Sequence, residues 1–406
     1  MKRIFALVLI SMLALLPILS LAEGSVQLTM GSWRNDDAVM VEQLLAQYKE
    51  LTGVEIIFQP TVSSQYNSVL RTWLDAGTGP DLMYARSYAT GRELYEAGFL
   101  MDCSDIPGVE ENFVESSLEP WRTTDGKMFA VPFAAVTQVI YYNKDIFAAN
   151  EIEVPTTWDE FIAVCDKLLA AGVTPISNGL ASNWDILECG FLGMLPNYVG
   201  GAEERAQYEA KEKKLNDENF VKAYADFAKL SAYFPDGFES IGNDDAVMYF
   251  AMGQSAMFMN GSWSCGDYEP YGLEGSNVGT MAFPVPEGGF NALCFHPDMA
   301  IAGNTATGHP EEVKAFLEWI ATPEGAQVTA DYLPAGFFPM INAPITIKNE
   351  VANEILGLNE GRITDARFIW PNMMNLYDPM LEQLNALCRG ETTPEAAADA
   401  IAALYE

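Results

Sequence analysis

The sequence predicts an α/β fold, in which helices cover a largely parallel sheet. Short apolar stretches of strand length alternate along the chain with longer segments whose apolar residues keep the i, i+3, i+4 spacing of a helix. Glycines stand where several of these helices should end. Among the 406 residues, 49% are hydrophobic and 12% aromatic, so the chain can build two or three cores.

The first strand and helix are predicted directly after an N-terminal apolar segment. Val26–Met30 alternates apolar and polar residues as a strand does. Asp36 and Asp37 then suit a helix start, and Gly53 suits the helix end. The helix between them buries one stripe of side chains, which are Val41, Leu44, Leu45 and Tyr48.

The same pattern then repeats once. Val54–Phe58 is the next predicted strand, Gly77 ends the helix that follows it, and Pro80–Tyr84 is a third strand. Three strands joined by two helices are typical of a parallel sheet, which binds ligands beyond the carboxyl ends of its strands. The loops at that edge are Trp33–Asp36 and Tyr84–Arg86. No glycine-rich phosphate loop follows the first strand, so nucleotide binding has no support.

The middle of the chain predicts a second α/β unit. Met128–Pro132 and Val139–Tyr142 are strand-like and flank residues 133–136. Thr157 with Glu160 matches a capping box at a helix start, and Val173–Ile176 is a further strand. The acidic, lysine-rich residues 202–219 are interpreted as a solvated helical face or hairpin. The run Asn243–Asp245 is expected to cap a helix that begins near Ala246.

The charge of the chain excludes several partners. Its 56 Asp and Glu residues against 22 Lys and Arg give a formal net charge of −34. Nucleic acids and anionic membranes are bound by clustered Lys and Arg, so neither is expected as a partner. Two histidines cannot build a multi-histidine metal site, and no cofactor or metal is expected. The six cysteines include no Cys-x-x-Cys motif, and the sequence does not decide whether they are buried thiols or form disulfides.

Residues 1–22 are predicted to be a signal peptide. Lys2 and Arg3 precede an apolar run, and small residues stand where a signal peptidase cleaves, around Ala22. A retained membrane anchor is the alternative, but Pro17 and the small residues favour cleavage. The protein is therefore expected to be exported to a periplasm or to the cell surface.

Five segments carry a resemblance to a known family. The chain resembles the bacterial extracellular solute-binding proteins of ABC importers, in the carbohydrate-binding group that includes maltose-binding proteins. All five segments occur in order and are spread over nearly the whole chain after residue 22. They are Ala76–Leu82, Phe129–Pro132 with Tyr141–Phe147, Pro155–Phe161, Phe250–Met257 with Gly261–Trp263, and the helix from Pro310 to Gln327 with Gly336–Pro339.

The resemblance implies a fold and a function. It implies a two-lobed periplasmic-binding-protein fold of type II, with residues 23–133 and 298–343 in the N-terminal lobe and 134–297 and 344–406 in the C-terminal lobe. Chain crossovers are expected near 131–137, 290–299 and 340–346. The expected protein is a monomer and not an enzyme, closes around a mono- or oligosaccharide by hinge motion, and delivers it to the membrane permease of an ABC transporter.

Candidate ligand-binding residues are aromatic or planar polar groups in the loops. Aromatic faces cover the apolar side of a sugar ring, and amide, carboxylate or guanidinium groups pair with its hydroxyls. For each tryptophan a place in the core stays open as well. Arg367 is a further cation worth testing near the cleft. The candidates are Trp33, Arg34, Asn35, Asp36, Tyr84, Arg86, Asn178, Trp184, Trp263, Asp298 and Trp370.

Two alternatives to carbohydrate binding stay open. The same fold could bind an oligopeptide, a polyamine or a metal complex. An exported glycoside hydrolase would need a pair of carboxylates in its cleft, whereas the loops at the strand ends offer Trp, Asn and Arg. Where maltose binders place an acidic residue, this chain has Ala134–Gln138, which argues against maltose itself.

Overall fold

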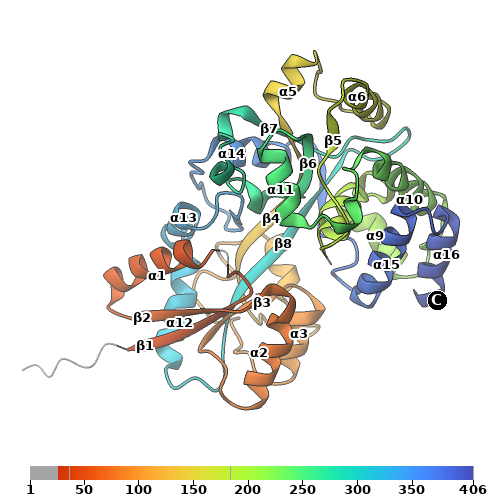
Figure 1. Ribbon diagram of the computed structural model, residues 1–406. Coiled ribbons are helices and arrows are strands. Elements are labelled where there is room, and N and C mark those ends of the chain that lie inside the picture. The colour runs from red at the N-terminus through yellow and green to blue at the C-terminus, as the bar shows by residue number, and fades with distance from the viewer. Residues whose placement is uncertain (1–25, 36, 183, 406) are drawn as a thin grey trace, which may run out of the picture.

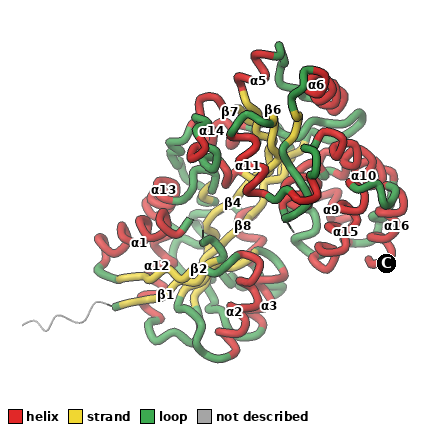
Figure 2. Tube along the Cα trace, in the orientation of Figure 1, coloured by secondary structure: helices red, strands yellow, loops and turns green. Residues whose placement is uncertain are grey.

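The chain folds into two lobes joined by long strands (Figure 1). The computed structural model describes residues 26–35, 37–182 and 184–405. The predicted signal peptide, Asp36 and Asn183 lie outside the described residues. The expected two-lobed α/β fold is confirmed, with helices around the strands of each lobe (Figure 2). No helix in the described part of the chain is long and apolar enough to cross a membrane.

The N-terminal lobe contains the three predicted strands and their helices. Strand β1 (Gln27–Ser32) pairs in parallel with β2 (Glu55–Pro60) and with β3 (Leu82–Arg86). Helix α1 buries the four predicted side chains, and Gly53 ends it with φ of 79°. The lobe's helices are α1 (Ala38–Thr52), α2 (Tyr66–Asp75), α3 (Ala89–Glu96), α4 (Glu115–Leu118), α12 (Pro310–Ile320) and α13 (Pro323–Tyr332).

Two long strands run from one lobe into the other. Strand β4 (Val131–Asn143) pairs with β8 (Ala292–Gly303) through residues 131–137 and 295–301. At one end β8 pairs with β3, and at the other β4 pairs with strands of the C-terminal lobe. The prediction of two strands separated by residues 133–136 is therefore wrong. The register instead shifts between Pro132 and Ala135, as in a β-bulge that bends a strand.

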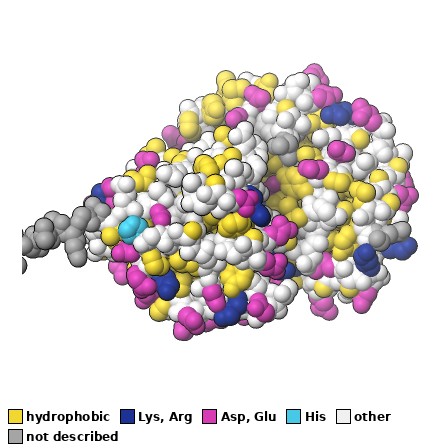
Figure 3. Space-filling model, turned by 90° about the horizontal axis from the view of Figure 1, so that it is seen from below, with side chains coloured by type: hydrophobic (Ala, Val, Ile, Leu, Met, Phe, Trp, Pro, Cys, Tyr) yellow, Lys and Arg dark blue, Asp and Glu magenta, His cyan; other side chains and the backbone are white. Residues whose placement is uncertain are grey.

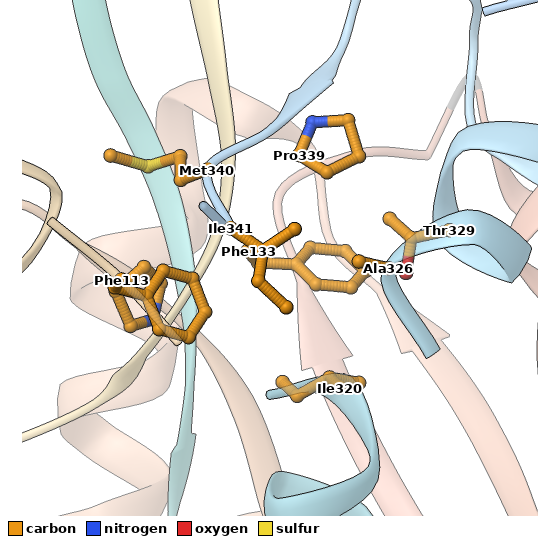
Figure 4. Close-up of a pocket in the computed structure, with 9 residues that line it drawn as sticks. Phe113, Phe133, Ile320, Ala326, Thr329, Pro339, Met340 and Ile341 are labelled. Carbon is orange, nitrogen blue, oxygen red and sulfur yellow. The ribbon is translucent and has the colours of Figure 1, made fainter. Parts of the chain in front are cut away.

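A third crossing lies beside these strands. Strand β9 (Phe338–Pro339) pairs with Ala134 and Ala135 of β4. Next to it, Phe133 points into a small, mostly apolar pocket that is lined by residues of the N-terminal lobe and of the crossing segment (Figure 4). The bend in β4 is therefore packed between β9 and the helices α12 and α13. The labelled lining residues are Phe113, Phe133, Ile320, Ala326, Thr329, Pro339, Met340 and Ile341.

The C-terminal lobe surrounds the far halves of β4 and β8 with helices. Its other strands are β5 (Thr174–Ile176), β6 (Ser255–Gly261), β7 (Val278–Met281) and β10 (Ile363–Asp365). A π-helical turn at Ile186–Phe191 precedes α7 and α8. The helices are α5 (Lys144–Ala149), α6 (Trp158–Ala170), α7 (Leu192–Met194), α8 (Pro196–Val199), α9 (Ala202–Glu209), α10 (Glu218–Leu230), α11 (Asn243–Ala251), α14 (Glu350–Gly357), α15 (Tyr377–Cys388) and α16 (Pro394–Tyr405).

Local predictions in this lobe had mixed outcomes. The capping box of Thr157 and Glu160 at the start of α6 is confirmed. Asn243 does not precede α11 but opens it, because Gly242 is the last extended residue before the helix and its N–H donates to the Asp245 carboxylate. Within residues 202–219, α9 is not wholly solvated, since Arg205 and Tyr208 are buried. These two side chains face the rest of the lobe, which the charge pattern could not reveal.

The buried apolar residues form separate cores. One cluster combines residues 28–136 with 299–341, and two others lie on the C-terminal side of the crossovers. The exact lobe boundaries given above stay a prediction. All six cysteines are buried and free, so the disulfide alternative is wrong.

Candidate ligand-binding site

Trp33, Tyr84 and Arg86 lie together at the carboxyl ends of β1 and β3. The Trp33 ring meets Tyr84 edge-on, with 5.4 Å between ring centres. The Arg86 guanidinium carbon lies 3.7 Å from the Trp33 ring centre, a close cation–π contact. Trp33 and Tyr84 are buried, whereas Arg86 is partly exposed. On the N-terminal lobe, the wall of the candidate cleft therefore consists of the Arg86 guanidinium, with the rings of Trp33 and Tyr84 behind it.

The polar loop after β1 is tied to its own lobe. Arg34 donates from Nε and Nη2 to the Asp37 carboxylate, at 2.5 and 2.8 Å. Its guanidinium also lies 5.0 Å from the Phe337 ring centre. Asn35 is exposed, and Asp36, which is also a predicted ligand-binding residue, lies outside the described residues.

Trp184 and Trp263 form the aromatic part of the C-terminal wall. Their ring centres are 6.0 Å apart and their planes meet at 51°. Trp184 stands just before the π-helical turn, and Trp263 lies in the turn that follows β6. Both rings are partly exposed, and Trp263 also packs against the core of the N-terminal lobe. The two rings therefore offer apolar faces near the crossover.

A buried arginine connects most of the remaining candidates. Arg367 Nη1 lies 2.9 Å from Glu188 and 3.6 Å from Asp298. Its guanidinium carbon lies 4.9 Å from the Trp370 ring and 5.6 Å from the Trp263 ring. Burial lowers the pKa of Arg367, but Glu188 and Asp298 raise it above its ordinary value. Arg367 thus stays charged and fixes the position of several cleft candidates at once.

Sequence reasoning did not identify Glu188 or Tyr377. Glu188 accepts a hydrogen bond from the Tyr377 hydroxyl at 2.6 Å and pairs with Arg367 through its other oxygen. These residues come from the π-helical turn, from α15 and from the segment before it. No local motif links positions so far apart in sequence, so only the fold reveals the cluster.

Trp370 and Asn178 are placed mainly by packing. Trp370 is 7% exposed and meets His296 and Tyr377 edge-on, at ring-centre distances of 5.3 and 5.6 Å. Asn178 is fully buried, and its amide exchanges two hydrogen bonds with the backbone of Met259, at 2.8 and 2.9 Å. Asn178 therefore fixes the loop that follows β5 against strand β6. Both the oxygen and the nitrogen of its amide are already hydrogen-bonded.

Asp185 is a buried carboxyl group beside Trp184. Its Oδ1 accepts from the backbone N–H of Ile186 at 2.9 Å, while Oδ2 has no hydrogen-bond partner. Burial raises the pKa of Asp185 to about 7, and Glu188 adds to the effect. Among the described residues, no group of histidine, cysteine and carboxylate side chains is arranged to hold a metal ion.

The two walls face each other. Burial lowers the pKa of Arg86, while Asp298 and Glu188 raise it and Arg367 lowers it further. Such effects require charges that are near enough to interact through the protein interior. Figure 3 shows the molecule hollowed between its lobes, with hydrophobic side chains gathered there. Arg86, which lies over the Trp33 ring, is thus within electrostatic reach of the charged cluster around Arg367. Arg34 and Asn178 are instead engaged within their own lobes.

Comparison with known proteins identifies the class. The family model described as "Bacterial extracellular solute-binding protein" matches residues 32–327. The chain belongs to this family, which confirms the resemblance and the expected export.

Individual relatives are distant. A multiple sugar-binding protein of Streptococcus mutans is 23% identical over 60% of this chain, and the match spans 58% of that protein. A galactooligosaccharide-binding protein of Bacillus subtilis is 23% identical over 80% of this chain and 76% of its own length. A solved bacterial solute receptor with a preference for β-D-galactopyranose has a TM-score of 0.83 at 18% identity, covering 94% of this chain and 99% of its own. The likeness to this solved receptor shows a shared fold.

Proposed function

We propose that the protein captures a mono- or oligosaccharide between its lobes and delivers it unchanged to an ABC transporter permease. The observation that carries this proposal is the meeting of aromatic faces with planar charged groups. Trp184 and Trp263 present rings, while Arg86 presents guanidinium donors. Rings cover the apolar side of a sugar, and a guanidinium pairs with hydroxyls. Sugar-binding relatives in the family support the same class of ligand.

The lobe boundaries and the monomeric state belong to this proposal. Residues 23–133 and 298–343 are proposed as the N-terminal lobe, and residues 134–297 and 344–406 as the other. The separate core clusters on the two sides of the crossover support this division. Light scattering of the purified protein should give the mass of a single chain.

A thermal-shift screen tests the ligand class. We expect sugars to raise the melting temperature, because a ligand at a hundred times its Kd stabilises the folded state by about 2.7 kcal/mol. The screen should include amino acids, short peptides and polyamines. If only these compounds raised the melting temperature, the ligand would not be a sugar. If chromatography showed that a glycan is cleaved, the protein would be a hydrolase and not a binding protein.

Replacing Trp263 with alanine should weaken sugar binding. The variant loses a partly exposed ring of the aromatic pair, so we expect at least a tenfold higher Kd by calorimetry, equal to about 1.4 kcal/mol. Trp73→Ala, at a partly exposed tryptophan of α2 that was not a site candidate, is the matched control and should bind as wild type. Equal affinities of the two variants would contradict a ligand contact by Trp263.

A further inference from the structure

Tyr88 belongs to one lobe by sequence and to the other by packing. It lies between β3 and α3, and its neighbours Tyr84 and Ala85 are part of the N-terminal core. The Tyr88 side chain is only 4% exposed, yet it belongs to the core cluster of the C-terminal lobe. The ring therefore crosses from its own lobe into the opposite one.

The backbone of Tyr88 has a conformation that favours glycine. Its φ of 59° and ψ of −133° match the first central position of a type II′ turn. Its N–H donates to the Pro120 carbonyl at 2.7 Å, and its carbonyl accepts from the Arg92 N–H at 3.0 Å. A bulky residue is strained in this region, and such strain persists where a side chain has a role.

Charged groups of both lobes act electrostatically on the Tyr88 phenol. Burial raises the pKa of its phenol, as do Glu119 of its own lobe and Asp365 of the other, while Arg205 lowers it. Arg205 is buried and its Nε lies 2.8 Å from Asp365. Burial also raises the pKa of Glu119, whereas Arg205 lowers the pKa of that carboxyl group. In Figure 1, α3 lies on the side of its lobe that faces α9 and α15.

We propose that Tyr88 is an interlobe contact that holds the lobes together and sets the affinity for ligand without touching the ligand. Seating the ring in the opposite core favours the closed arrangement. A ligand that binds only this arrangement has an apparent Kd inversely proportional to its population. The effect on affinity rests on the proposed function, whereas the effect on the distance between lobes does not.

Tyr88→Gly is the decisive variant. Glycine accepts the same backbone angles, so the turn is kept while the ring is lost. Without ligand, we expect small-angle X-ray scattering to give a larger radius of gyration for Tyr88→Gly than for wild type. Tyr88→Phe keeps the ring and should scatter as wild type. Identical scattering of the glycine variant and wild type would overturn the proposal.

Ligand binding provides the second readout. With the best sugar from the thermal-shift screen, we expect Tyr88→Gly to raise the Kd about tenfold or more, and Tyr88→Phe to leave it nearly unchanged. An equal loss in both variants would assign the effect to the hydroxyl and overturn the interlobe role of the ring. Should circular dichroism show that the glycine variant is unfolded, Tyr88→Asn replaces it, because asparagine is also tolerated at positive φ. If no sugar binds, the proposed function fails while scattering still decides the role of Tyr88.

Discussion

Replacing Arg367 with methionine should destabilise the fold by about 3–5 kcal/mol, as expected when one partner is removed from a buried ion pair. The guanidinium is 2% exposed and lies 2.9 Å from Glu188 and 3.6 Å from Asp298. Methionine fills part of the volume but leaves both carboxylates without their cation. Denaturant unfolding at neutral pH measures the loss of free energy.

An exposed ion pair provides the control for this variant. Arg71 pairs with Asp75 on α2 at 3.1 Å, with about half of each side chain exposed. Arg71→Met should cost at most about 1 kcal/mol, the usual range for surface pairs. Adding Glu188→Gln to Arg367→Met should recover part of the lost stability, since one unpaired charge is removed. A cost for Arg367→Met no larger than for the control would show that the cluster is not tightly coupled.

Asp185→Asn should stabilise the protein at pH 8 and lose this advantage towards pH 4. Burial raises the pKa of Asp185 to about 7 in the folded state, against 3.8 ordinarily. The folded state therefore keeps a proton that the unfolded state releases, so wild-type stability falls as pH rises from about 4 to 7. Asparagine cannot ionise and avoids this penalty. At about 1.4 kcal/mol per pKa unit, we expect a gain of about 2–4 kcal/mol at pH 8.

Unfolding curves across this pH range test the Asp185 prediction. Asp236→Asn, at an exposed carboxylate, changes the charge equally and should show no comparable pH-dependent gain. The asparagine at position 185 can still accept from the Ile186 N–H, so the hydrogen bond at Oδ1 is kept. A difference from wild type that does not change between pH 4 and pH 8 would show that Asp185 ionises normally in the fold.

Local elements of the fold could be predicted wherever one short segment decides them. The stripe on α1, its end at Gly53 and the Thr157 capping box depend on residues a few positions apart, and the structure has them as predicted. The interruption expected in β4 was wrong for a physical reason. The sequence showed strand-like residues on either side of 133–136, but pairing with β8 and β9 keeps the strand continuous through these residues, with a bulge.

The candidate site was predictable in its residue types and less so in its contacts. The strand-end rule led to Trp33, Tyr84 and Arg86, which the fold places together. It could not reveal that the amide of Asn178 is engaged by β6, or that Trp370 lies edge-on to His296. No sequence pattern pointed to Glu188, because its partner Arg367 is 179 positions away along the chain.

By itself the sequence determined the alternation of strands and helices, the acidic surface and the family. Propensity, periodicity and charge act over a few residues and need no knowledge of distant partners. Only the tertiary structure decided which charges pair with Arg367 and that Tyr88 packs into the opposite lobe. Those contacts join residues that are distant along the chain and become neighbours only when β4 and β8 bring the lobes together.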